Sequence, residues 1–154
     1  GGIYLAGEVG ERLGAHNWGA TIVAEGAGDA AGYRMHSGTL VILGEVGVNL
    51  GAGMDGGVVY VLDFNLDTLY PDHTHGRLVA APLEDLDIRI LTAVIAEHVE
   101  STQSRIGTIL LTDPDQLANR FTKIHHEGYS PHAQCSQASS HNVWNRILQA
   151  TQNT

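Results

Sequence analysis

The sequence predicts an all-β solenoid, a right-handed parallel β-helix of about three coils followed by a small C-terminal helical extension. The first observation is an internal glycine repeat: sixteen of the nineteen glycines lie within the first 57 of 154 residues. They form four columns with steps of eighteen or nineteen residues: Gly7, Gly26 and Gly44; Gly10, Gly28 and Gly47; Gly14, Gly32 and Gly51; Gly19, Gly38 and Gly57. We predict that these glycines are structural residues at the corners of stacked coils.

The second observation is a set of short apolar segments between the glycines. At a nineteen-residue step they align as three columns: Ile3, Ile22, Val41 and Tyr60; Tyr4, Val23, Ile42 and Val61; Leu5, Ala24, Leu43 and Leu62. β-Branched and aromatic residues favour strands, and glycine suits the corners between them. Neighbouring side chains of a strand point to opposite faces, so both faces are apolar here. This predicts that the outside of the β-helix is covered by the C-terminal helices or by another domain.

The chain is divided at residues 63 and 124. Residues 1–63 form the predicted β-helix, residues 64–124 a connector and a helical extension that packs on it, and residues 125–154 a poorly ordered tail with no apolar periodicity. Apolar residues recur every three or four positions over 83–100, which predicts an amphipathic helix. A second short helix is expected from Arg105 to Leu111. Asp113 and Pro114 are typical of a helix start, so a third helix is expected to end near Arg120.

The composition argues against several classes of protein. The net charge of −9 disfavours a nucleic-acid partner, and no apolar run is long enough for a membrane-spanning helix. The single cysteine, Cys135, excludes a disulfide framework and is typical of a reducing compartment. The chain opens inside the first repeat, without a methionine or a signal peptide. We therefore interpret it as a piece of a longer polypeptide.

One glycine segment has a second interpretation. Residues 51–56 fit the dinucleotide-binding pattern GxGxxG through Gly51, Gly53 and Gly56. That motif requires a strand before it and a helix after it. A strand is predicted after it here, over 58–61, so we interpret the segment as a corner and expect no cofactor-binding residue.

Two histidine-rich segments are candidates for metal binding. Asp72, His73 and His75 lack a further ligand fixed by spacing, and zinc sites need tighter pairs than the second segment offers. That segment contains His125, His126, His132, Cys135 and His141. We predict no metal ligand in either segment. The alternative is an enzyme that binds a metal through these histidines, and metal analysis of the purified chain would distinguish the two. Nor is a catalytic residue predicted: adjacent Glu97 and His98 point in different directions on a helix, and Cys135 has no activating neighbour.

Two further expectations concern single residues of the repeat. Arg12 and Arg34 are the only cations among the first 63 residues. We expect them to pair with Glu8, Glu11 or Asp29 between coils or to reach an adjoining domain. Replacing Gly47 with valine is expected to disrupt the coil, because a β-branched residue at positive φ is strained.

Several segments of the repeat follow a known family pattern, namely residues 7–14, 17–20, 23–29, 44–57 and 60–63. On these segments, the stretch from residue 1 to residue 63 resembles the C-terminal GXGXG repeat domain of the glutamate synthase large subunit. The chain departs from the family pattern at Trp18, where the family has serine, at Leu50, where it has an aromatic residue, and over 33–38, where Tyr-Arg-Met-His-Ser-Gly replaces Glu-Tyr-Met-Thr-Gly-Gly. Residues 91–105 are similar to the family's final helices, and residues 121–124 to its last strand. We see no match beyond Ile124.

The resemblance implies a function for the parent protein. The family makes two glutamates from glutamine, 2-oxoglutarate and reducing equivalents, with FMN and an iron–sulfur cluster held in other domains. It implies that this fragment is a non-catalytic, cytoplasmic support that braces the amidotransferase and FMN domains. The expected partners are those domains and a small reductase subunit or ferredoxin. The alternative is a free-standing β-helix scaffold subunit of another redox complex, similar to the glycine-repeat subunit of formylmethanofuran dehydrogenase, whose repeats lack the helical extension.

Overall fold

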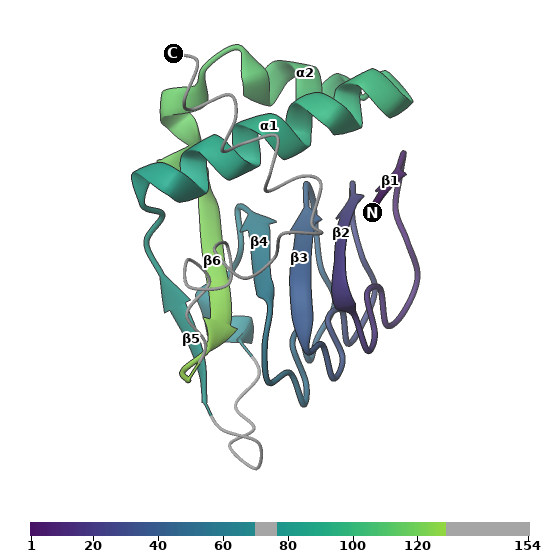
Figure 1. Ribbon diagram of the computed structural model, residues 1–154, viewed down its shortest axis with the longest axis vertical. Helices are drawn as coiled ribbons and strands as arrows, with labels where there is room; N and C mark the ends of the chain where they lie inside the picture. Colours follow the sequence, from purple (N-terminus) through teal and green to yellow (C-terminus); the bar gives the residue numbers. More distant parts are fainter. Residues whose placement is uncertain (70–76, 129–154) are drawn as a thin grey trace.

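The computed structural model describes residues 1–69 and 77–128, which form a β-solenoid of about three turns with helices packed on one side (Figure 1). One six-stranded sheet has the order β1-β2-β3-β4-β6-β5. Four strands are parallel: β1 (Gly2–Leu5), β2 (Trp18–Ala24), β3 (Ser37–Ile42) and β4 (Val58–Leu62). Strand β6 (Phe121–His126) is antiparallel to both β4 and β5 (Leu78–Ala81). No helix of the described ranges is long and apolar enough to cross a membrane.

The corners of successive coils are stacked as closely as the strands. The Val9 N–H donates to Gly26 O at 3.0 Å, and the Ala27 N–H donates to Glu45 O at 2.9 Å. Left-handed backbone recurs at equivalent corner positions. Gly14, Gly32 and Gly51 have φ angles of 70°, 72° and 75°. Positive φ angles also recur in two further columns, one formed by Arg12, Ala30 and Asn49 and the other by His16, Arg34 and Gly53. The same turn geometry therefore repeats from coil to coil, and an all-glycine column avoids the strain that a Cβ brings there.

The strand register corrects the sequence alignment by one residue. Ile22 pairs with Leu40 and Leu40 with Val59, whereas the fixed nineteen-residue step puts Val41 and Tyr60 in the column of Ile22. A β-bulge between Trp18 and Thr21 changes the pairing step from nineteen residues to eighteen. Because a one-residue shift exchanges the two faces of a strand, Val41 and Tyr60 share the face of Val23.

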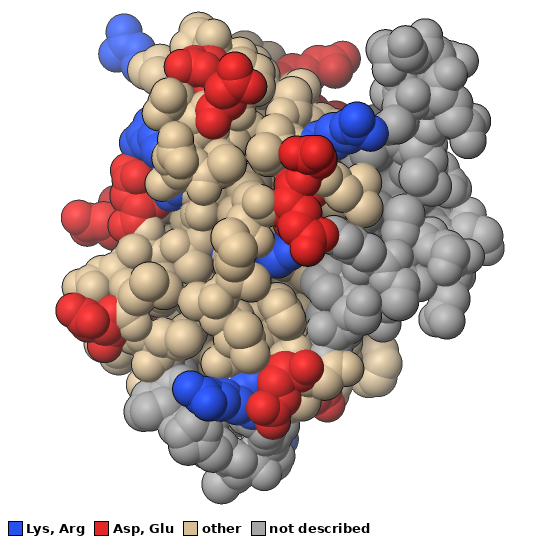
Figure 2. Space-filling view, turned by 90° about the vertical axis from the view of Figure 1, so that its left-hand side faces the viewer, with Lys and Arg blue, Asp and Glu red and all other residues tan. Residues whose placement is uncertain are grey.

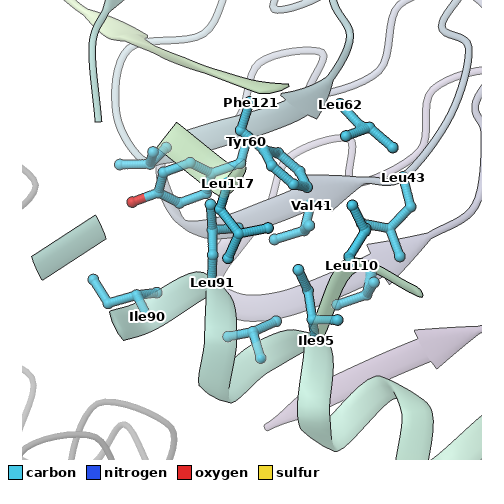
Figure 3. Close-up of a cluster of buried hydrophobic side chains, with 13 residues drawn as sticks. Val41, Leu43, Tyr60, Leu62, Ile90, Leu91, Ile95, Leu110, Leu117 and Phe121 are labelled. Carbon is cyan, nitrogen blue, oxygen red and sulfur yellow. The ribbon is translucent and has the colours of Figure 1, made fainter. Parts of the chain in front are cut away.

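The sheet separates two apolar clusters. The inner cluster lies between the strands and the corners and contains Ile22, Leu40 and Val59, with Leu50 and Met54 from the corners. The outer cluster joins the opposite strand face to the helices and contains Val23, Val41, Tyr60, Ile90, Leu91, Val94, Ile95, Leu110, Leu117 and Phe121 (Figure 3). Fully burying such a side chain stabilises a protein by about 1.5–3 kcal/mol. Of the two covers predicted for the outer strand face, the C-terminal helices or another domain, the structure shows the helices.

Three α-helices and two 3₁₀ turns form the rest of the described fold. Helix α1 (Asp85–Thr102) runs across the strands, and α2 (Arg105–Leu111) returns beside it (Figure 1). A 3₁₀ turn, η2 (Pro114–Gln116), then leads into α3 (Leu117–Arg120), in the place of the third predicted helix.

The connector and the last strand differ from the sequence-based expectation. The connector contains a 3₁₀ turn, η1 (Leu66–Thr68), and strand β5, neither of which the sequence pattern predicts. Strand β6 continues through His126, and the Glu127 N–H donates to Arg77 O at 2.8 Å. The expected tail therefore begins later than residue 125, because β6 finds partners on both sides in β4 and β5. The rest of the predicted tail, 129–154, lies outside the described residues.

Candidate functional site

A buried carboxylate links the first turn of α1 to two strands. Asp87 is completely buried. Its Oδ1 accepts a 2.6 Å hydrogen bond from the Tyr60 hydroxyl on β4, and its Oδ2 pairs with Lys123 Nζ on β6 at 2.8 Å and accepts from the Glu84 N–H. Burial raises the pKa of Asp87, but the bonds from Lys123, Tyr60 and Glu84 and the charge of Lys123 outweigh burial, so the pKa is lowered. The carboxylate is therefore held ionised between helix and sheet.

A second carboxylate links the end of β2 to the other end of α1. Glu25 Oε2 accepts from the Gly7 N–H at 2.8 Å, and Oε1 accepts from the Ser104 hydroxyl and lies 3.3 Å from His98 Nε2. Because a carboxylate only accepts, Nε2 of the fully buried His98 carries the proton. Burial raises the pKa of Glu25, but the bonds from Ser104, Gly7 and His98 and the charge of His98 lower it overall. Ser104 also caps α2 by accepting from the Gly107 N–H at 3.1 Å.

Aromatic and cationic side chains gather at the corners that precede β2, β3 and β4. The indole of Trp18 stacks on the His36 ring at a centroid distance of 4.3 Å, and His36 Nδ1 lies 2.8 Å from Asp55 Oδ1. We call this group the corner cluster: Arg12, His16, Trp18, Tyr33, Arg34, His36 and Asp55. A hollow of about 390 Å³ lies within it, lined by His16, Arg34, His36, Gly53 and Asp55. Trp18 is 75% exposed at this face.

The two arginines of the repeat share an aromatic ring. Arg12 Cζ lies 4.8 Å and Arg34 Cζ 5.4 Å from the centroid of Tyr33. Cation–π contacts at exposed sites are worth about 0.5–1 kcal/mol. Within the described residues neither guanidinium forms an ion pair, so the expected pairing with Glu8, Glu11 or Asp29 is wrong. The alternative, contact with an adjoining domain, stays a prediction. Asp29 instead accepts from the Val48 N–H at 2.9 Å and thereby joins two coils.

The structure also places the other residues considered from the sequence. Gly51 and Gly53 lie in a turn with φ of 75° and 70°, and strand β4, not a helix, follows them. The neighbours on α1 diverge as expected: Glu97 accepts from the Tyr4 hydroxyl, whereas His98 faces Glu25. No group of three or more histidine, cysteine or acidic residues within 1–69 and 77–128 could hold a metal ion. His73, His75, His132, Cys135 and His141 lie outside the described residues.

Sequence reasoning misses both carboxylate networks and the corner cluster. Nothing in the sequence separates the buried Asp87 from the exposed Asp85 beside it. A signal for the corner cluster does exist. Trp18 and His36 precede Gly19 and Gly38 by one and two residues, so stacking of the coils brings them together, and Asp55 precedes Gly57 by two.

On the face seen from the side of β5 and β6, acidic and basic residues are mixed and neither sign dominates (Figure 2). Figure 2 shows acidic and basic side chains interspersed there among broad areas of other residues. This face gives no sign of the continuous basic surface that nucleic-acid binding requires.

Comparison with known proteins gives one consistent result. The family model described as "GXGXG motif" matches residues 1–127. The chain is 33% identical over 121 residues to glutamate synthase (NADH) of Schizosaccharomyces pombe, covering 79% of the chain and 6% of that protein. It is 38% identical over 128 residues to the chloroplastic ferredoxin-dependent glutamate synthase of Spinacia oleracea, covering 80% and 8%. It is 32% identical over 127 residues to glutamate synthase (NADPH) large chain of Bacillus subtilis, covering 82% and 8%. The chain spans less than a tenth of the length of these relatives.

Proposed function

The chain belongs to the GXGXG motif family, and from this premise we propose that it is a non-catalytic structural domain of a glutamate synthase. In this proposal the parent enzyme makes glutamate from glutamine, 2-oxoglutarate and a reductant. Residues 1–63 form the repeat domain, residues 64–124 pack on it, and the remainder is a tail. The domain braces the amidotransferase and FMN domains of the same cytoplasmic polypeptide.

One structural observation is the main argument for a structural role. The buried Asp87 and the partly buried Glu25 both join α1 to the sheet. Their pKa values are lowered by these contacts, whereas a general acid or base needs a pKa close to the working pH. Such residues hold two layers at a fixed distance, and a rigid layered body is what a brace between catalytic domains requires.

The cofactors of the parent enzyme do not fit this chain. An iron–sulfur cluster is held by several cysteine thiolates, and Cys135 is the only cysteine of the sequence. Residues 51–56, which fit the dinucleotide-binding pattern, lead into strand β4 and not into a helix. We therefore assign FMN and the cluster to other parts of the polypeptide. The relatives are named for NADH, NADPH and ferredoxin, so the domain is compatible with either a small reductase subunit or ferredoxin as partner.

The sequence encoded upstream of Gly1 tests the assignment to a glutamate synthase. We expect a continuous reading frame that encodes an FMN barrel with a three-cysteine motif. A start codon directly before the first repeat would instead indicate a separate scaffold subunit.

A variant of the complete polypeptide tests the structural role. Gly47→Val is expected to lower both the folded yield and glutamate formation, because Gly47 packs against the preceding coil. The activity of each correctly assembled molecule should be unchanged. Loss of glutamate formation in a variant that folds and assembles normally would contradict a purely structural role.

A further inference from the structure

The hollow of the corner cluster has the size and lining of a small binding site. Its volume of about 390 Å³ lies within the range of ligand pockets, roughly 300–1,000 Å³. Among the described residues that line it, His16, Arg34 and His36 carry nitrogen donors. His16 and Arg34 have φ of 57° and 51°, a backbone conformation that is uncommon outside glycine, asparagine and aspartate. The corner thus presents a guanidinium and two imidazoles from successive coils at one place.

The donors of this hollow are only partly used within the fold. Asp55 accepts from His36 Nδ1 at 2.8 Å, so one ring nitrogen of His36 is already used. Arg34 contacts the face of Tyr33 and pairs with no carboxylate within 1–69 and 77–128. A guanidinium presents several N–H groups in a plane that match the oxygens of a carboxylate or a phosphate. The described lining carries one guanidinium and one carboxylate, so an anion would be held there by the N–H groups of Arg34 rather than by an excess of positive charge.

A flat apolar surface borders these donors. Trp18 stacks on His36 at an angle of 24° and is 75% exposed. An indole at the surface offers a large area for stacking another planar group, at low cost in conformational entropy. Trp18 and His36 belong to successive coils, and the stacking of the coils brings the two rings together at the edge of the hollow.

We propose that the hollow lined by His16, Arg34, His36, Gly53 and Asp55 binds a small molecule in which a carboxylate or phosphate is attached to a planar ring. The anion lies against Arg34 and His16, and the ring stacks on the free area of Trp18. The proposal concerns the corners before β2, β3 and β4. It therefore holds or fails independently of the scaffold role, which rests on the contacts between α1 and the sheet.

Titration of the whole chain tests the proposal. The sequence has two tryptophans, so the Trp144→Phe variant leaves Trp18 as the only indole. Phenyl phosphate and benzoate combine a ring with each kind of anion, inorganic phosphate lacks the ring, and benzyl alcohol lacks the charge. We expect a saturable change in Trp18 fluorescence with at least one ring-bearing anion, whose identity assigns the anion class. Inorganic phosphate and benzyl alcohol should each bind at least about tenfold more weakly.

Two variants and a control locate the site. Arg34→Gln should weaken binding by roughly tenfold or more, because a charge-assisted hydrogen bond is lost. Trp18→Ser, measured by calorimetry, should weaken it by loss of stacking. Arg89→Gln removes an exposed guanidinium from α1 and should change nothing. The proposal is overturned if neither ring-bearing anion binds saturably, if benzyl alcohol or inorganic phosphate binds equally well, or if Arg34→Gln behaves as Arg89→Gln does.

Discussion

At the residue scale, Gly47 has no room for a side chain. A Cβ at this position would lie 2.1 Å from Asp29 Oδ1 and 2.7 Å from the Asp29 backbone nitrogen. The φ of Gly47 is not in the left-handed range, so the strain expected from the sequence is not the reason it is glycine. Contact with the preceding coil is the reason, because backbone atoms there cannot rotate away as a side chain can.

The matched pair Gly47→Ala and Gly10→Ala tests this explanation. Gly10 belongs to the same glycine column, has no left-handed φ, and a Cβ there would meet nothing within 4 Å. We expect Gly47→Ala to destabilise the fold by about 1–3 kcal/mol through overpacking. Gly10→Ala should be neutral or stabilising by a few tenths of a kcal/mol, through the unfolded state. Equal losses in denaturant unfolding would show that the column is selected for something other than close stacking.

Single residues show both what the sequence can predict and what it cannot. The glycine columns follow from spacing alone, because a stacked corner repeats its geometry and glycine marks it. The reason for each glycine does not follow, since positive φ at Gly51 and close approach at Gly47 give the same residue in the sequence. Charge alone predicts that Arg12 and Arg34 pair with acidic side chains. In the structure both guanidinium groups instead lie over the ring of Tyr33.

At the element scale, the attachment of α1 to the sheet depends on the buried pair of Asp87 and Lys123. Asp87→Asn leaves a buried ammonium without its counter-charge. We expect a loss of about 3–5 kcal/mol in the free energy of unfolding. Asp63→Asn provides the control, because Asp63 pairs with Arg120 at 2.8 Å on the surface, where an ion pair is worth about 0–1 kcal/mol. Similar losses for the two variants in denaturant titrations would contradict the assigned role of Asp87.

The two lowered carboxylate pKa values predict acid sensitivity. In the unfolded chain Glu25 and Asp87 titrate near 4.5 and 3.8, and in the folded chain they titrate lower. The folded state therefore binds fewer protons, so its stability is fully present above these values and falls as pH drops through and below them. The free energy of unfolding, measured between pH 7 and pH 3, should decline more steeply for the native chain than for Glu25→Gln or Asp87→Asn. An unchanged slope in both variants would show that other groups govern acid unfolding.

Elements are predictable where one periodic signal dominates. The helix over 83–100 and the helix from Arg105 to Leu111 agree with α1 and α2, because their apolar faces recur at helical spacing. Strand β5 escapes prediction because Leu78–Ala81 is four residues long, too short for alternation to be visible. The bulge near Trp18 escapes it for a different reason: a fixed repeat length cannot show where one residue is dropped.

At the scale of the whole molecule, the repeat and the helical part form one structure. Strand β4, the last coil, pairs with β6 from the far end of the described chain. The outer face of β2, β3 and β4 is sealed by α1, α2 and α3 through the outer cluster. The two-sided apolar strands predict such a cover, but not the antiparallel pairing, because an added strand leaves no mark on the repeat itself.

This closure predicts that residues 1–63 alone are poorly soluble. Without residues 64–154, β4 loses its partner β6, and Val23, Val41 and Tyr60 lose the cover of α1. An open strand edge beside a continuous apolar face favours association between copies. Expressed alone, the fragment is expected in the insoluble fraction or as large aggregates in size-exclusion chromatography. Under the same conditions the full chain should stay in the soluble fraction and elute without aggregates. A soluble fragment that unfolds cooperatively would show instead that the inner cluster alone stabilises the solenoid, and that the helical layer is an attachment rather than part of its core.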